Sequence, residues 1–127
     1  MTNFVEIIKD LIKRVSDLER KPTLMKWVVN TDGTNITFDM SKGTRHSITV
    51  SVTGRTFLVS NAVEGMVFVV RVKQPAGGSC AVNWFAGITW AGGSIPTLTA
   101  TGNKADEFIF ICTGTNTYDG FVVGLNI

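Results

Sequence analysis

The chain has 127 residues, which is enough for one compact domain and a short appendage. Its net charge of +2 is close to neutral and its basic residues are scattered, so charge gives no argument for binding nucleic acid or an anionic membrane. Hydrophobic residues make up 44% of the chain and charged residues only 17%, which is more apolar than a small monomer requires. We therefore expect copies of the chain to cover part of this surface in a homo-oligomer.

The chain lacks the patterns that direct proteins into or across membranes. It contains no run of about 18 apolar residues, so we expect no membrane insertion. Its first residues lack the charged start, apolar stretch and cleavage site of a signal peptide, so we expect synthesis in the cytoplasm. Cys80 and Cys112 have no metal-binding or redox spacing, and we expect both to be reduced and buried in the core.

The first predicted element is a helix over residues 3–20, which contain no glycine or proline. The short side chain of Asn3 can cap its free N–H groups. Apolar residues recur at alternating spacings of four and three, which is the seam of a coiled coil. Ile7 and Ile12 flank this seam and widen it, which favours three or more strands. The seam residues are Phe4, Ile8, Leu11, Val15 and Leu18.

The end of this helix carries a more specific pattern. The segment Arg14–Glu19 resembles the trimeric coiled-coil signature Arg-h-x-x-h-Glu, in which h is apolar. The resemblance implies a salt bridge between Arg14 of one chain and Glu19 of a neighbour, with the arginine stem over the apolar layer. The sequence thus predicts a homotrimer. The alternative is an amphipathic helix that folds back on its own chain.

The rest of the chain has β composition, and we place the boundary between a helical segment, 1–22, and a head domain, 23–127. All 13 glycines follow this boundary. Thr31–Thr34 predicts a tight Asp-Gly hairpin. Residues 66–72 and 108–112 are apolar at nearly every position, which predicts strands covered on both faces. The fold class expected is all-β, an antiparallel, jelly-roll-like β-sandwich. The predicted strands are 26–30, 36–40, 48–52, 55–60, 66–72, 81–84, 88–90, 108–112 and 118–125.

Residues able to support catalysis or bind metal are few. His46 is the single histidine, and no nucleophile elbow or oxyanion hole accompanies it, so we expect an ordinary histidine at a strand edge. Asp106 and Glu107 are adjacent, and adjacent strand residues point to opposite faces, so the two cannot serve one substrate. Zinc needs about four close ligands, which the sequence does not offer. We expect no enzyme, no cofactor and no metal.

Aromatic residues near glycine-rich turns are the one candidate for a ligand surface. Trp84, Trp90 and Tyr118 could stack on a sugar ring, with Asn83 and Asp119 bonding its hydroxyls. The same aromatic rings could instead fill the core. Both interpretations stay open at this stage.

Sequence patterns in the β region resemble a known family of domains. The most specific are W-x-G-G-x-x-P-T-L-T-x-T over residues 90–101 and N-K-x-D-x-F over residues 103–108. Together they resemble the C-terminal head domain of bacteriophage tail-fibre, receptor-binding and head-fibre proteins. Further segments that carry the resemblance are Gly65–Phe68, Val72–Gln74, Gly77-Gly78, Val82–Trp84, Gly120–Asn126, Ile36–Ser41 and Thr56-Phe57.

The resemblance implies a virion protein, usually a trimer, without a cofactor. Residues 1–22 alone precede the head, so we expect a head fibre or capsid decoration protein rather than a whole tail fibre. Its N-terminal end would bind another virion protein of the capsid, neck or tail. One alternative is a tail-fibre tip that recognises host glycans. A polysaccharide depolymerase would require clustered acidic residues, which the sequence does not offer.

Overall fold

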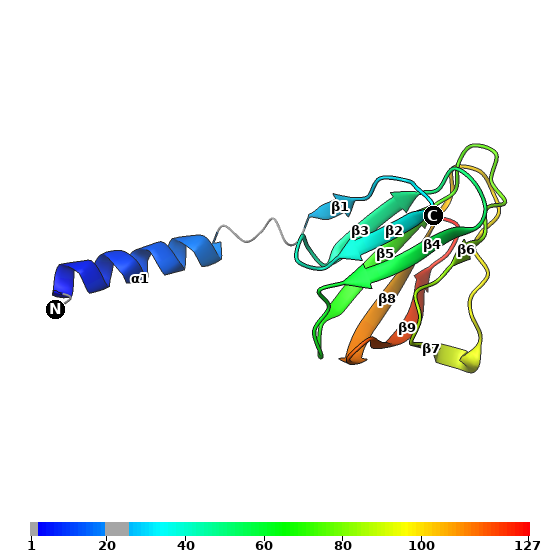
Figure 1. Ribbon diagram of the computed structural model, residues 1–127. Coiled ribbons are helices and arrows are strands. Elements are labelled where there is room, and N and C mark those ends of the chain that lie inside the picture. Colours follow the sequence, from blue (N-terminus) through cyan, green and yellow to red (C-terminus); the bar gives the residue numbers. More distant parts are fainter. Residues whose placement is uncertain (1–2, 20–25) are drawn as a thin grey trace.

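The computed structural model describes residues 3–19 and 26–127, with the side chains of 17–19 outside the described part. The predicted boundary between residues 22 and 23 lies outside the described residues. We call residues 26–127 the head. The described elements are one α-helix, α1 (Phe4–Glu19), a 3-10 turn, η2 (Ala91–Gly93), and strands β1 (Trp27–Val29), β2 (Asn35–Asp39), β3 (Arg45–Thr49), β4 (Arg55–Ser60), β5 (Val67–Lys73), β6 (Val82–Asn83), β7 (Ile88–Trp90), β8 (Ala105–Gly114) and β9 (Thr117–Gly124) (Figure 1).

Helix α1 forms where the sequence predicts it. The Asn3 side chain caps it, because its Oδ1 accepts the backbone N–H of Glu6 at 2.9 Å. Exposed ion pairs follow along the helix, including Arg14 with Asp10 at 3.0 Å. Such pairs add little stability in water, so the helix depends on what its apolar face contacts.

The apolar face of α1 is open in the single chain. Phe4 is 76% exposed and Leu11 is 55% exposed. The described residues of α1 form no extended contact with any strand, and the helix projects away from the head in Figure 1. The described residues of α1 thus show no packing of the helix on its own head, so the alternative of a helix folded back on its own chain gains no support from them.

The strands form two sheets, a mixed sheet of six strands and a parallel sheet of three. One has six strands in the order β1-β3-β5-β8-β9-β7, and the other has three in the order β2-β4-β6. From β1 to β6 the chain alternates between the sheets, so successive strands within each sheet run parallel. Among the described pairings, only β5–β8 and β8–β9 are antiparallel. The antiparallel, jelly-roll-like expectation is wrong, because alternating apolar residues specify a strand's faces but not its direction.

The Asp-Gly turn near residue 32 also differs from the prediction. A hairpin is excluded because β1 and β2 lie in different sheets. The Asp32 carboxylate instead accepts two hydrogen bonds from Arg55, at 3.0 and 2.9 Å, and one from the Ser51 hydroxyl. These bonds hold the pKa of Asp32 below its usual value. They attach the loop after β1 to the start of β4.

The buried side chains of both sheets form one core. In β5, Phe68, Val70 and Val72 point inward and are buried, while the alternate residues point outward. Outward-facing residues of β5 and β8 are partly open to water, so these strands are covered on one face only in the single chain. The core includes Ile36, Phe38, Met40, Ile48, Val50, Phe57, Cys80, Phe85, Trp90, Phe108, Phe110, Cys112 and Tyr118.

Candidate functional site

His46 lies inside the core rather than at a strand edge. Its side chain is fully buried. Its Nε2 donates to the carbonyl of Gly43 at 2.8 Å, and its Nδ1 accepts from the Asn30 amide at 3.1 Å. Burial is the main cause that lowers the pKa of His46, so the neutral ring is the favoured form. Both ring nitrogens are occupied, which makes His46 a connection between β1 and β3 rather than a general base.

Asp106 and Glu107 point to opposite faces of β8, as predicted. The buried Asp106 carboxylate accepts the Thr99 backbone N–H at 2.6 Å, the Thr99 hydroxyl at 2.7 Å and the Asn126 backbone N–H at 2.9 Å. Glu107 pairs with Arg71 of β5 at 2.6 Å on the outer face. The two carboxylates therefore cannot act on one substrate.

The five residues of the candidate sugar-binding surface do not share one surface. Trp90 is 8% exposed and Tyr118 is 4% exposed, so neither ring face is free to stack on a ligand. Trp84 is partly buried. By the alternation along their strands, Asn83 lies on the outer side of the three-stranded sheet and Asp119 on that of the six-stranded sheet.

Trp84 is the centre of an aromatic cluster that joins the two sheets. Its ring centroid lies 4.8 Å from Phe108, 5.2 Å from Trp90 and 5.3 Å from Phe57. The rings meet mostly edge to face, a favourable geometry for aromatic pairs. The tryptophans therefore serve chiefly as core residues, one of the two interpretations left open by the sequence.

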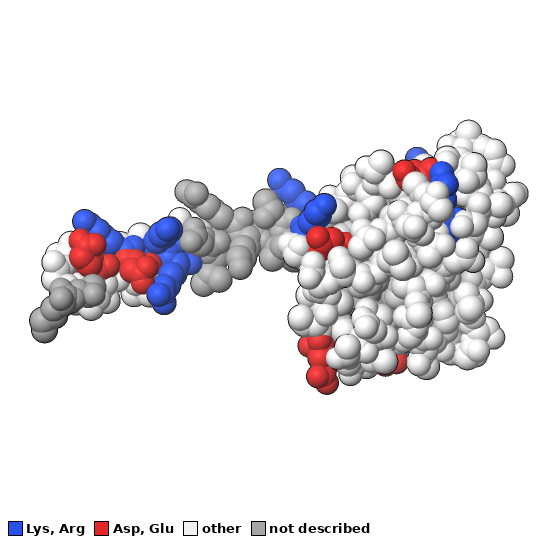
Figure 2. Space-filling model, in the orientation of Figure 1, with Lys and Arg blue, Asp and Glu red and all other residues white. Residues whose placement is uncertain are grey.

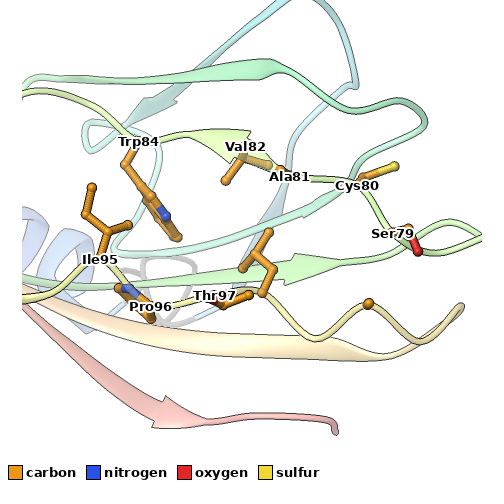
Figure 3. A pocket seen from close by; sticks show the side chains of 10 residues that line it. Ser79, Cys80, Ala81, Val82, Trp84, Ile95, Pro96 and Thr97 are labelled. Atoms are coloured by element: carbon orange, nitrogen blue, oxygen red, sulfur yellow. The ribbon is translucent and has the colours of Figure 1, made fainter.

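A groove runs beside Trp84 between β6 and the segment after η2. It consists of two adjoining hollows of about 420 and 360 Å³ that share Val82, Trp84 and Ile95. In Figure 3 the Val82 and Trp84 side chains point toward the segment that carries Ile95 and Pro96. None of the described residues that line the groove is charged. The groove can bind an uncharged ligand, but it offers no acid–base pair.

The motif that carries the family resemblance forms one structural unit. Gly92 and Gly93 turn the chain at φ values of 83° and 79°, and Asn103 turns it again at 62°. Thr99 donates hydrogen bonds to the Asp106 carboxylate, and these bonds join the two halves of the motif. The unit shapes the outer wall of the groove. Sequence reasoning did not identify Ile95 as a wall residue, although its exposed apolar side chain lies inside the quoted motif.

The predicted trimerisation residues lie along α1. Phe4, Ile8, Leu11 and Val15 are exposed, and Leu11 and Val15 line a shallow apolar hollow on the helix. Arg14 pairs with Asp10 of its own helix. The side chains of Leu18 and Glu19 lie outside the described residues. The described part of α1 thus presents an apolar seam with no partner in the single chain.

No group of three or more histidine, cysteine, aspartate or glutamate side chains is placed to hold a metal ion among residues 3–19 and 26–127. No helix in the described part of the chain has the length and apolar character needed to cross a membrane. Compared with known proteins, the chain matches no family model, no curated protein and no solved structure.

Proposed function

We propose that this chain is a homotrimeric structural protein of a bacteriophage particle, a head fibre or capsid decoration protein. Three α1 helices associate as a parallel coiled coil, and each head is a β-sandwich carried at their end. The observation that carries the proposal is the exposed seam of Phe4, Ile8, Leu11 and Val15. Large apolar side chains that recur at coiled-coil spacing are stable in water only when another helix covers them.

The length of α1 indicates that the helix and the head both contribute to the stability of the trimer. Isolated helices shorter than about 12–15 residues are marginal in water, and α1, with 16 residues, barely exceeds this length. Its own ion pairs are exposed and weak. In the trimer, Arg14 exchanges its partner Asp10 for Glu19 of the neighbouring helix, as the signature implies. Association then stabilises the helix and the helix stabilises the association.

The character of the head supports a structural role. Figure 2 shows one face of the head, on which charged residues are few and gather in small groups. Its groove contains no charged side chain, and its single histidine is buried and hydrogen-bonded. These features fit a protein that stabilises a particle and has no enzymatic activity. The resemblance of residues 90–108 to phage head domains points to the same role.

The N-terminal end is the proposed attachment point. In Figure 1 the N-terminus lies at the end of α1 that is farthest from the head. A trimer of this shape can bind another virion protein of the capsid, neck or tail with its helical end and present its heads outward.

Electron microscopy of particles tests this proposal. Particles assembled with the wild-type chain should carry an antibody against the head at regular sites on their surface. Leu11→Asp places a charge in the seam and should abolish incorporation, while Lys13→Asp on the opposite face of the helix should not. Particles without label, or equal incorporation of the two variants, contradict the proposal.

A receptor-binding fibre tip is the second candidate, and the groove beside Trp84 is the observation that favours it. A groove of this volume lined by apolar groups and by the Asn83 amide suits a host glycan. Ile95→Arg places a long side chain at the groove from an exposed position, so the core is preserved. If the tip binds glycan, this variant should lose adsorption to host cells and still assemble. Normal adsorption contradicts this second function.

A further inference from the structure

The outer face of the six-stranded sheet carries a continuous apolar surface across three strands. In the strand register, Val69 of β5 lies beside Ile109 of β8, and Ile109 lies beside Phe121 of β9. One step along the sheet, Val67 lies beside Ile111. Alternation with the buried residues places all five side chains on the outer face. We call Val67, Val69, Ile109, Ile111 and Phe121 the outer band.

The other sheet shows what a solvated outer face looks like in this protein. On the three-stranded sheet, the outward positions include Asn35, Thr37, Thr56 and Ser60. Leu58 is the apolar exception there, and it is 43% exposed. Strands β5, β8 and β9 pair antiparallel, and antiparallel sheets that face water on one side usually alternate apolar and polar residues. The outer band departs from this alternation in β5, β8 and β9, which indicates that another surface covers it.

Charges around the outer band suit another copy of this chain. Arg71 and Glu107 form an ion pair beside it, and Arg45 and Asp119 lie next to it in the strand register. The face therefore carries both signs in similar number. A partner with one dominant charge would leave part of these groups unmatched, whereas another copy of this chain carries both signs.

The size of the face explains why it does not act alone. Six strands about 4.8 Å apart and about five residues long cover roughly 500 Å². A standard interface buries about 800 Å² on each partner. The face falls short of this value, so its association requires a second contact.

Helix α1 supplies that second contact. Seven residues separate Glu19 from Trp27, and a chain of that length reaches at most roughly 28 Å. This reach is similar to the diameter of a domain of about 100 residues. Helices joined at their seam therefore hold the heads at a high effective concentration, at which a weak face associates.

We propose that the outer band is the contact between heads in the trimer, with a second copy of this chain as its partner. The inference rests on the proposed trimer and extends it from the helices to the heads. Each head places Val67, Ile109 and Phe121 against a neighbour, and the Arg71–Glu107 pair lies at the border of that contact. In the assembly, strands β5 and β8 are then covered on both faces, by the core on one side and by the neighbouring head on the other.

Matched variants of the full chain test this contact. Val67→Glu places a charge in the outer band, at a side chain that is 51% exposed and therefore outside the core. Leu58→Glu places the same charge at a similarly exposed position on the other sheet. Sedimentation equilibrium gives the dissociation constant of each trimer, and circular dichroism shows whether each head is folded. Val67→Glu should raise the dissociation constant at least tenfold, and Leu58→Glu should leave it unchanged.

A cross-linking experiment makes the test independent of affinity. A Val67→Cys variant should be joined between chains by a short bis-maleimide, while a Leu58→Cys variant should not. Cys80 and Cys112 are buried and provide a low background. A wild-type trimer in which both variants behave alike overturns the head contact and leaves the helical trimer intact. The head contact is also overturned if Val67→Glu prevents attachment to particles but leaves the dissociation constant of the trimer unchanged. A wild-type monomer overturns the proposed function and this inference together.

Discussion

The buried side chain of His46 should make the stability of the head depend on pH. Because burial lowers the pKa of His46 in the folded head, the unfolded chain takes up the proton first as the pH falls. The free energy of unfolding should therefore fall below about pH 6.5, by at most about 1.4 kcal/mol per pH unit. Urea unfolding at pH 7.5 and pH 5.5, at one protein concentration, measures this loss.

A glutamine variant isolates the contribution of this side chain. His46→Gln cannot titrate, so it should be less stable at pH 7.5 but lose the dependence between pH 5.5 and 7.5. Asp39 does not interfere, because hydrogen bonds from Asn61 and Ser41 lower its pKa to about 2. That group loses its contribution only as the pH falls from about 3.8 towards 2. An unchanged slope in the glutamine variant would show that another group titrates.

The hydrogen-bond donors around Asp106 lead to a second prediction, which concerns stability. Asp106→Ala removes the buried acceptor of three partly buried hydrogen bonds from Thr99 and Asn126, which should cost about 3 kcal/mol of unfolding free energy. Thr99→Ala removes one donor and keeps the carboxylate bonded to backbone, so it should cost about 1 kcal/mol. Thermal and urea unfolding of the two variants measure the difference, and equal losses would contradict this assignment.

At the scale of elements, the pairing of β7 with β9 depends on Gly87. This glycine has a φ of 85°, and a Cβ atom there would lie 2.0 Å from the carbonyl oxygen of Asn116. Gly87→Ala should therefore separate β7 from β9 and cost more than about 3 kcal/mol. Gly92 has a similar φ of 83° with open space around it, so Gly92→Ala should cost only about 1 kcal/mol. Unfolding curves that place the two variants together would contradict the close approach.

The elements also show how far the sequence predicts the fold. The capped helix follows directly from local residues. Strand β3 is Arg45–Thr49 rather than residues 48–52, because His46 takes an inward position once its ring nitrogens are bonded. Only apolar residues were counted as inward in the prediction, so this shift was missed. Strand direction was also missed, because the connections between the two sheets leave no mark in the periodicity of any one strand.

The sequence left the role of the aromatic residues open for a related reason. The sequence places Trp84, Trp90 and Tyr118 near turns, but distant elements decide which rings are covered. Trp90 packs on Phe108 and Phe110 from β8, and this contact buries it. The groove wall at Ile95 arises only when the bonds between Thr99 and Asp106 fold its segment back. Long-range contacts of this kind cannot be derived from local residue patterns.

At the scale of the whole molecule, the described residues leave two apolar surfaces open in the single chain, on α1 and on the outer band. Their separation along the chain makes association cooperative, since each contact raises the effective concentration for the other. Leu11→Asp and Val67→Glu should each weaken the trimer, and the double variant should be monomeric. Size-exclusion chromatography with light scattering across a dilution series measures the loss. A double variant that remains trimeric would mean that other residues hold the assembly.

Sedimentation equilibrium of the full-length chain at micromolar concentration tests the central claim most directly. A helix seam and a sheet face that both need partners predict one species with three times the 13.8 kDa mass of the chain. A single species of 13.8 kDa would mean that both surfaces are stable in water, and the fibre account would then be wrong.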